Sequence, residues 1–247
     1  MLVLLPPSES KWAGPARGAP VRLEALTAPE LTAAREQVLD ALVEVSSRPD
    51  APALLGAGAS LAEAVRANTT LRGRPAAPAA RVYTGVLFDA LDLPSLPAPA
   101  ARRVLVVSAL WGVLRPRDRV PGYRLSMGTD LPGIGPLATF WRPRLTAALA
   151  PSGVVVDCRS AAYAAAWLPD AATAERTVAV RVLRGGKVVS HAAKHTRGLL
   201  ARHLLTRPGR PPRTPGHLLD AAGEAFAAKL LEPARPGATW TLEVQAP

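Results

Sequence analysis

The chain has 247 residues, 49% of them hydrophobic and 20% charged, a composition that fits a folded protein with a sizeable core and excludes wholesale disorder. Thirty Lys and Arg residues face 19 Asp and Glu residues, and the resulting net charge of +11 favours anionic partners, although a GC-rich genome also produces an arginine excess. The single cysteine, Cys158, excludes a disulfide framework, and without a secretory signal or a membrane-spanning stretch we expect a cytoplasmic protein.

The first hundred residues are predicted to begin with a strand and continue mainly as helices. Met1–Leu5 is a short apolar run typical of a buried strand, and a loop over Pro6–Ala28 follows it. Two segments fit the capping-box pattern, in which a Ser or Thr precedes a Glu by three residues. They predict a helix from Thr27-Ala-Pro-Glu30 to about Ser47 and a shorter one from Ser60-Leu-Ala-Glu63 to about Ala67, with another short helix within Val82–Leu91.

The rest of the chain alternates between strands and helices. Arg103–Ser108 and Gly153–Cys158 are continuous apolar runs, as in interior strands of a parallel sheet. Thr177–Leu183 and Lys187–His191 flank Arg184-Gly-Gly186 and predict a hairpin, and Thr239–Val244 predicts a last, edge strand. Helices are expected over about Pro136–Ala150, Ser160–Trp167 and Lys194–Thr206. This order indicates one α/β domain over residues 1–247, with a mixed, partly parallel sheet and an inserted helical section.

The densest polar segment follows the strand that ends at Ser108. Trp111, Arg115, Asp118, Tyr123 and Arg124 fall within fourteen residues, interrupted by Gly and Pro. Ligands of α/β folds gather beyond the carboxyl ends of strands, and Arg grips phosphate or carboxylate through two hydrogen bonds. Asp118 is either a general base or a residue that holds an arginine in place. The alternative is a solvated loop whose charges pair with each other.

A second basic segment spans Arg181–Arg213, with nine Lys or Arg residues and no Asp or Glu. Lys194 and Arg197 fall near the start of the helix predicted there, where free backbone N–H groups add partial positive charge. The segment is therefore a candidate anion site. A solvated helix face is the alternative, although such faces usually mix charges of both signs.

Two glycine pairs and two histidines are further candidate sites. Leu55-Gly56-Ala-Gly58 and Leu131-Pro-Gly133-Ile-Gly135 both fit the short pattern of a helix-hairpin-helix, whose turn amides bind phosphate. His191 and His195 lack an adjacent acidic ligand, and a strand-to-helix break is expected between them, so we expect no metal and no other cofactor. An inert, buried Cys158 is favoured over a redox thiol.

Several motifs in this order resemble the YaaA family of peroxide-stress proteins. The segments are Leu5-Pro-Pro-Ser8-Glu9-Ser10-Lys11, Tyr83-Thr84-Gly85, Ser108-Ala-Leu-Trp111 through Arg115-Pro-Arg-Asp118, Pro121-Gly-Tyr123-Arg124 through Gly128, Phe140-Trp141 and Lys194-His-Thr-Arg197-Gly198. The chain departs from the family pattern at Asp157-Cys158-Arg159-Ser160, where only Ser160 and the following Tyr163 carry over.

The resemblance implies a basic cleft, a helix-hairpin-helix-like element near Leu55–Arg66, affinity for double-stranded DNA and protection from oxidative damage through lower free iron. The DNA- or anion-binding residues it implies are Ser8, Lys11, Tyr83, Arg115, Arg124, Ser160, Lys194 and Arg197, with Gly56 and Gly58 as phosphate-loop candidates. Two hypotheses follow. One is non-specific DNA binding; the other is an enzyme acting on a nucleotide-like or other anionic small molecule, with Lys11, Asp118 and Tyr123 as catalytic residues.

Overall fold

The fold is built on one large, mostly parallel sheet, seen in a computed structural model that describes residues 1–185, 187–188 and 191–246. Within these residues the strand order is β11-β12-β9-β8-β1-β3-β4, and β10 pairs with the C-terminal end of β9. The strands are β1 (Leu2–Leu5), β3 (Val104–Ser108), β4 (Gly112–Leu114), β8 (Val155–Asp157), β9 (Thr177–Arg184), β10 (Lys187–Val188), β11 (Ala228–Leu231) and β12 (Trp240–Gln245). This confirms the predicted mixed α/β fold.

Five adjacent strands, β12-β9-β8-β1-β3, run parallel, whereas β4, β10 and β11 are antiparallel to their neighbours. The apolar run of β1 is almost wholly buried, as expected for a central parallel strand covered on both faces. The chain passes from β1 to β3 on one side and later returns to β8 on the other. The loops that leave these three strands therefore start from the same edge of the sheet, where ligands of such folds bind.

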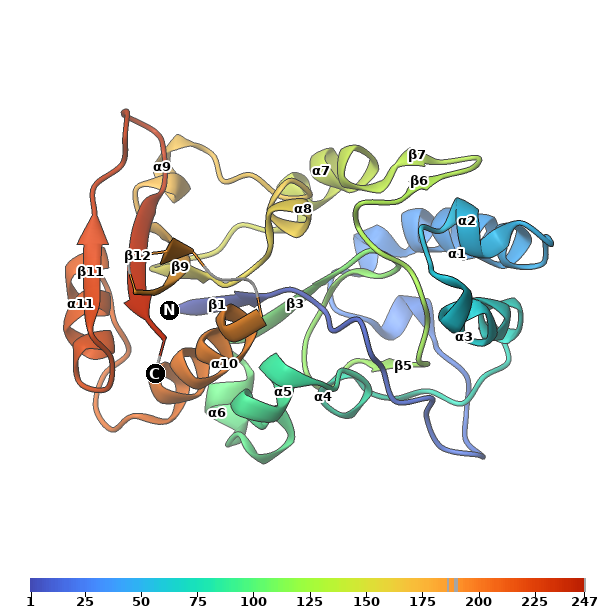
Figure 1. Ribbon diagram of the computed structural model, residues 1–247, viewed down its shortest axis with the longest axis horizontal. Helices are drawn as coiled ribbons and strands as arrows, with labels where there is room; N and C mark the ends of the chain where they lie inside the picture. The colour runs from blue at the N-terminus through green and yellow to red at the C-terminus, as the bar shows by residue number, and fades with distance from the viewer. Residues whose placement is uncertain (186, 189–190, 247) are drawn as a thin grey trace.

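Helices cover the sheet and extend the molecule at one end (Figure 1). The group α1–α3 lies at one end of the view, and β11, β12 and α11 lie at the other. The α-helices are α1 (Thr32–Ser46), α2 (Ala51–Leu54), α3 (Ala62–Arg66), α4 (Ala79–Val82), α5 (Val86–Leu91), α6 (Ala98–Ala101), α7 (Leu137–Ala148), α8 (Ala161–Ala164), α9 (Ala171–Ala174), α10 (His191–Thr206) and α11 (Pro215–Gly223). Short 3-10 helices span Leu23–Ala25, Pro29–Leu31, Ala59–Leu61, Ala67–Thr70 and Leu93–Ser95. Two small ladders pair β2 (Ala77–Pro78) with β5 (Arg119–Val120) and β6 (Asp130–Leu131) with β7 (Gly135–Pro136).

No helix of the described residues is both long and apolar enough to cross a bilayer.

Helix α10 packs closely on α5 because a glycine removes the side chain between them. A Cβ atom on Gly198 would lie 2.3 Å from the carbonyl oxygen of Leu87, a distance that no side chain tolerates. The contact fixes α10 against α5 and so helps to determine where Lys194, near the start of α10, lies.

A buried arginine joins α1 to the sheet. Arg35 is fully buried and has no carboxylate partner among the described residues. Its guanidinium instead donates to the carbonyl oxygens of Leu23, Thr27, Ala28, Trp111 and Val113. Burial lowers the pKa of Arg35 to about 10, while Asp118 and Glu30 act in the opposite direction, so the group remains charged at neutral pH.

The two predicted capping boxes do not form. Thr27 gives both its amide and its hydroxyl to the carboxylate of Asp118, and α1 begins only at Thr32, after a 3-10 turn. Helix α3 begins after Leu61 and has no side-chain cap, so Ser60 does not cap it. In both cases the helix is present near its predicted position, because apolar packing maintains it without the cap.

Three other expectations are corrected. β12 is an interior strand, because β11, which the sequence did not reveal, pairs with its outer side. Gly133 and Gly135 both have positive φ and turn the β6–β7 hairpin, so this pair is no helix-hairpin-helix. His191 and His195 share α10 without a break. The β9–β10 hairpin is confirmed, although Gly186, Val189 and Ser190 of the predicted turn and second arm lie outside the described residues.

Candidate functional site

The candidate site forms around Lys11, in the loop that leaves the central strand β1. An antiparallel bridge joins Lys11 to Tyr83, and the amide of Trp12 donates to the carbonyl of Val82 (2.9 Å). On the other side the backbone of Gly122 approaches so closely that a Cβ there would lie 2.4 Å from the Trp12 carbonyl oxygen. Three segments distant in sequence are thereby held together.

The side chain of Lys11 is enclosed by aromatic rings. Its Nζ lies 4.4 Å from the centre of the Tyr123 ring and 5.8 Å from that of Tyr83. Its one hydrogen bond among the described residues is to the carbonyl oxygen of Ser8, at 2.7 Å. The residue as a whole is only half-buried by surface area, yet its amine is surrounded by protein atoms. Burial, assisted by the nearby charge of Arg124, lowers the pKa of Lys11 to about 7, although Glu9 opposes the shift.

Behind Lys11 runs a buried chain of hydroxyl groups. The phenol of Tyr123 lies 2.7 Å from Ser108 Oγ and 3.2 Å from the phenol of Tyr83, and the amide of Trp111 donates to Ser108 Oγ (3.0 Å). Burial raises the pKa of both phenols above their ordinary value. They stay protonated at neutral pH, and the ring of Tyr123 forms a wall beside the Lys11 amine.

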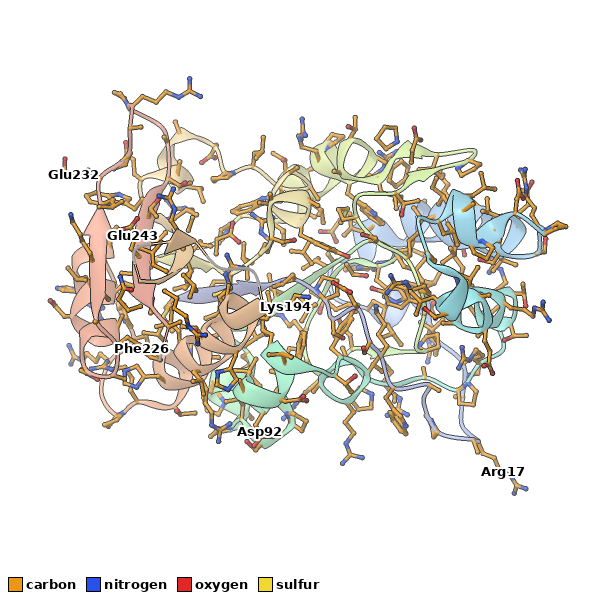
Figure 2. The ribbon with its side chains drawn as sticks, viewed as in Figure 1. Arg17, Asp92, Lys194, Phe226, Glu232 and Glu243 are labelled. Atoms are coloured by element: carbon orange, nitrogen blue, oxygen red, sulfur yellow. The ribbon has the colours of Figure 1, made fainter. Side chains whose placement is uncertain are left out.

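Three cations lie around Glu9, and among the described residues Lys194 is the one that pairs with its carboxylate. Lys194, from α10, donates to Glu9 Oε1 at 3.0 Å, and Arg124 donates to the Glu9 backbone carbonyl at 3.3 Å. The hydrogen bond and charge of Lys194 lower the pKa of Glu9, and Arg124 and Lys11 add to the effect against a small opposing cost of burial. Figure 2 shows Lys194 near the centre of the molecule, with Glu232 and Glu243 well away from it. We refer to Glu9, Lys11, Arg124 and Lys194 as the Lys11 cluster.

A cavity of about 320 Å³ opens beside the Lys11 cluster. One wall carries Lys11, Tyr123 and Arg124, and the other carries small residues of the helical section, among them Ala64 and Ala67. Arg74 also lines it, with its guanidinium held by the backbone carbonyls of Ala13 (2.9 Å) and Gly122 (3.3 Å). The helical section thus forms one side of the candidate site.

Asp118 and Arg115 are located elsewhere. The carboxylate of Asp118 accepts hydrogen bonds from the Thr27 amide (3.1 Å), the Thr27 hydroxyl (3.1 Å) and the Arg115 amide (2.9 Å). Arg115 donates to the carbonyl of Arg102 and lines a separate cavity that also contains Met1. Asp118 therefore anchors loops, and the structure brings neither residue into the Lys11 cluster.

Ser8, Arg197 and Ser160 also differ from the expected ligand set. Ser8 organises its own loop, since its hydroxyl donates to the Ser10 carbonyl and accepts from the Thr84 amide. Arg197 points to the sheet, where it donates to the carbonyl of Val180 at 3.1 Å. Ser160 is exposed at the start of α8 and does not cap it.

Cys158 is buried in the sheet, and burial raises the pKa of its thiol to about 12, although Arg197 nearby acts in the opposite direction. The thiol is therefore protonated and inaccessible, as an inert cysteine would be. The described residues contain no group of three or more His, Cys, Asp or Glu side chains arranged to hold a metal ion.

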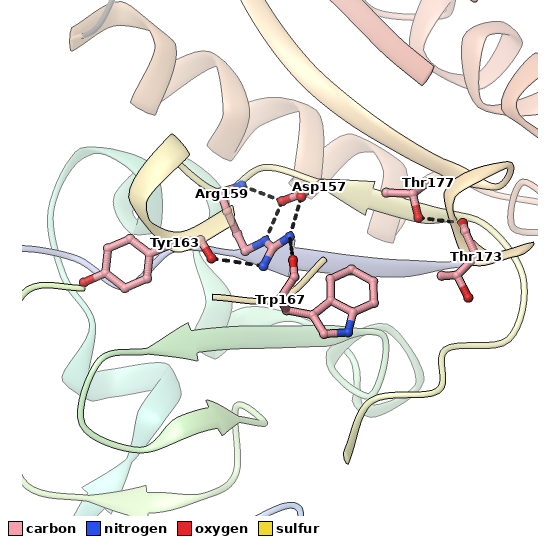
Figure 3. A network of polar contacts seen from close by, with 6 residues as sticks. All are labelled: Asp157, Arg159, Tyr163, Trp167, Thr173 and Thr177. Atoms are coloured by element: carbon pink, nitrogen blue, oxygen red, sulfur yellow. Dashed lines mark hydrogen bonds and ion pairs between the residues drawn. The ribbon is translucent and has the colours of Figure 1, made fainter. Parts of the chain in front are cut away.

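The loop after β8 is held by the most deeply buried ion pair among the described residues (Figure 3). Arg159 contacts Asp157 through Nε (2.8 Å) and Nη2 (2.7 Å) and also donates to the carbonyls of Tyr163 and Trp167. The phenol of Tyr163 in turn accepts from the Met127 amide at 3.3 Å. Asp157 and Arg159, which depart from the family pattern, thus hold this loop in place.

The glycine pair at Gly56 and Gly58 lies in the turn between α2 and the helical turn before α3. Gly56 has φ +59°, and its amide donates to Ala53, while the amide of Ala57 donates to Pro52. These two amides are already satisfied within the chain, so they are not free to bind phosphate.

Sequence reasoning missed Asn68, which fixes Arg124. Its side chain accepts from the Arg124 amide (2.9 Å) and donates to the Arg124 carbonyl (2.9 Å) and to Ser46 Oγ (3.2 Å). Asn68 is fully buried. An isolated Asn at a helix end carries no signal of such a role.

The comparisons with known proteins cover most of the chain. A family model described as peroxide stress protein YaaA matches residues 1–227. A UPF0246 protein of Streptomyces coelicolor is 47% identical over 256 aligned positions, covering 99% of this chain and 98% of that protein. A UPF0246 protein of Corynebacterium efficiens is 43% identical over 90% of this chain and 91% of its own length. One from Ralstonia nicotianae is 36% identical over 60% of this chain and 63% of its own.

Proposed function

This chain belongs to the family of the peroxide stress protein YaaA, as its motifs predicted, and from this premise we propose that it binds DNA phosphates at the Lys11 cluster. Binding would be non-specific in sequence and would limit peroxide and iron damage to DNA in the cytoplasm. The observation that carries the proposal is the grouping of three cations around Glu9: Lys194 pairs with its carboxylate, Arg124 donates to its backbone carbonyl, and the charge of Lys11 acts on it from nearby.

Glu9 marks the position that an external anion would take. Its side chain is 75% exposed and that of Lys194 is 51% exposed, so solvent and a polyanion can both reach them. An exposed ion pair contributes at most about 1 kcal/mol, so a phosphate can displace the carboxylate at little cost. Arg124 should keep its position when a phosphate replaces the carboxylate, because Asn68 forms hydrogen bonds with both the amide and the carbonyl of Arg124.

Salt dependence of binding to a duplex tests the proposal. Each phosphate contact releases counterions, so three contacts predict a slope of about −3 when log K is plotted against log salt concentration. Lys194→Gln should reduce the slope by about 1 and weaken binding to all sequences alike. Arg17→Gln is the matched control, because Arg17 is exposed and lies at the far edge of the molecule in Figure 2. A slope near zero, or equal effects of the two variants, contradicts the proposal.

An enzyme acting on an anionic small molecule is the second candidate, and the amine of Lys11 favours it. A lysine that grips phosphate is charged, whereas burial lowers the pKa of this amine to about 7 and so favours its neutral form more than in an ordinary lysine. Lys11→Arg separates the two functions, because arginine preserves a positive charge but offers no neutral amine. DNA binding should survive this change if charge alone matters, whereas turnover should be lost. Mass spectrometry of small molecules that co-purify with the protein would then identify the substrate class.

A further inference from the structure

The amine of Lys11 differs from every ordinary surface lysine in its surroundings. Lys194 is paired with Glu9, whereas no ion pair involves Lys11 among the described residues. Among the described residues the Lys11 amine has one acceptor, the Ser8 carbonyl, and it lies 4.4 Å and 5.8 Å from the centres of the Tyr123 and Tyr83 rings. A neutral amine has a lone pair that can react, and burial away from water favours that form over the charged one that the ring faces attract.

The space next to this amine suits a small phosphorylated molecule. The cavity of about 320 Å³ is at the lower end of the volumes that hold small ligands, which start at about 300 Å³. Arg124 and Glu9 line the same cavity, and Lys194 is paired with the Glu9 carboxylate. A phosphate on these two cations would place the rest of the molecule beside Lys11.

We propose that Lys11 is a nucleophile that forms an imine with an aldehyde whose phosphate is held by Arg124 and Lys194. The proposal rests on the proposed anion site at the Lys11 cluster. Such an aldehyde has two sources, the ring-opened sugar of an abasic site in DNA and a free sugar phosphate. Both present a carbonyl carbon a few bonds from a phosphate.

The covalent step balances without an additional reagent. The lone pair of Lys11 Nζ attacks the carbonyl carbon, a C–N bond forms, and the carbonyl oxygen takes up a proton as the nitrogen loses one. The resulting carbinolamine loses water and leaves the C=N bond of the imine. Water reverses the reaction and restores the amine.

Borohydride trapping tests this inference, because it reduces an imine to a stable secondary amine. The full-length chain would be treated in four parallel reactions, with a duplex containing one abasic site, an intact duplex, ribose 5-phosphate and ribose. We expect an adduct on Lys11, located by peptide mass spectrometry, at least tenfold above the other three lysines and above the ribose and intact-duplex reactions. An adduct with the abasic duplex alone assigns the source to DNA, and one with ribose 5-phosphate alone assigns it to a free metabolite.

Two variants keep the result interpretable. Lys11→Arg should abolish trapping, and its circular dichroism spectrum establishes whether it folds; Arg124→Gln retains the amine and should reduce trapping at low aldehyde concentration by about tenfold, with recovery at high concentration. No adduct with either phosphorylated aldehyde, an adduct spread evenly over all lysines, or equal trapping of ribose overturns the inference. If DNA still binds with a steep salt dependence while trapping fails, the inference alone is wrong. If neither DNA nor phosphate binds, the proposed function fails with it.

Discussion

Two buried cations, Arg35 and Lys11, show opposite ways of placing positive charge inside this fold. Arg35 donates to five backbone carbonyls, and burial lowers its pKa from 12.5 to about 10. Lys11 has one carbonyl and two aromatic rings, and its pKa falls to about 7. Burial lowers both pKa values, but the guanidinium starts from 12.5 and stays charged at neutral pH, whereas the amine starts from 10.5 and reaches neutrality. The difference teaches that an arginine with several carbonyl partners can serve as a buried structural cation where a lysine becomes a reactive one.

The comparison predicts that the two residues contribute oppositely to stability. Arg35→Met should lower the free energy of unfolding by about 3 kcal/mol or more, because it leaves several buried carbonyls without donors. Lys11→Met should change it by less than about 1 kcal/mol or raise it, because an enclosed charge is removed. Urea unfolding measures both, with Arg35→Lys as the intermediate case. Equal losses for the two Met variants would contradict the comparison.

Asp118 belongs with Arg35 in this scheme, as an anchor whose carboxylate is already occupied. Asp118→Asn should cost about 2 kcal/mol of stability, because the amide nitrogen cannot accept from the Thr27 and Arg115 donors. It should leave the affinity for DNA and the reactivity of Lys11 unchanged. Thermal unfolding and duplex binding, measured on the same preparation, check this; turnover lost without loss of stability would instead restore Asp118 as a catalytic residue.

The pH dependence of stability sharpens the contrast. The pKa of Lys11 in the folded protein lies below its ordinary value of 10.5, so between pH 7 and 10.5 the unfolded chain binds a proton that the folded protein does not. The contribution of Lys11 to the free energy of unfolding therefore rises with pH across that window, by at most about 1.4 kcal/mol per pH unit. Below pH 7 this contribution is constant. Lys11→Met should remove this rise. Parallel pH profiles of the two proteins would show that Lys11 is an ordinary exposed lysine.

The smallest effect is expected at the exposed end of the Lys11 cluster. Glu9→Gln should tighten duplex binding a few-fold at low salt, because it removes the competing carboxylate, and the gain should vanish as salt screens the charges. Glu24→Gln is a suitable control, because Glu24 forms a comparable exposed pair with Arg22. A gain in both variants would reflect net charge alone.

The sequence predicted the frame of the fold better than its details. The strands β1, β3 and β8 follow from uninterrupted apolar runs, whereas β11, with Lys229 in a short mixed segment, carries no comparable pattern. The capping box at Thr27 does not form because a tertiary partner, Asp118, takes the Thr27 amide and hydroxyl, and at Ser60 the cap is simply not made.

The candidate site was predictable in part. The family motifs led to Lys11, Tyr83, Tyr123, Arg124 and Lys194, which do converge. Arg115 and Asp118 belong to the same motif but lie elsewhere, because residues that are close in sequence can point in opposite directions from a loop. The role of Glu9 depends on Lys194, 185 positions away, and only the folded topology places them together.

Titration of the lysines by nuclear magnetic resonance tests the central claim most directly. The chain has only four lysines, Lys11, Lys187, Lys194 and Lys229, so ¹³Cε signals from labelled lysine can be resolved and assigned with Lys11→Arg. We predict one signal that titrates near pH 7, disappears in that variant, and moves to higher pH when inorganic phosphate is added, because a bound anion favours the charged amine. Four signals that all titrate near pH 10.5 and ignore phosphate would contradict a reactive amine in an anion site.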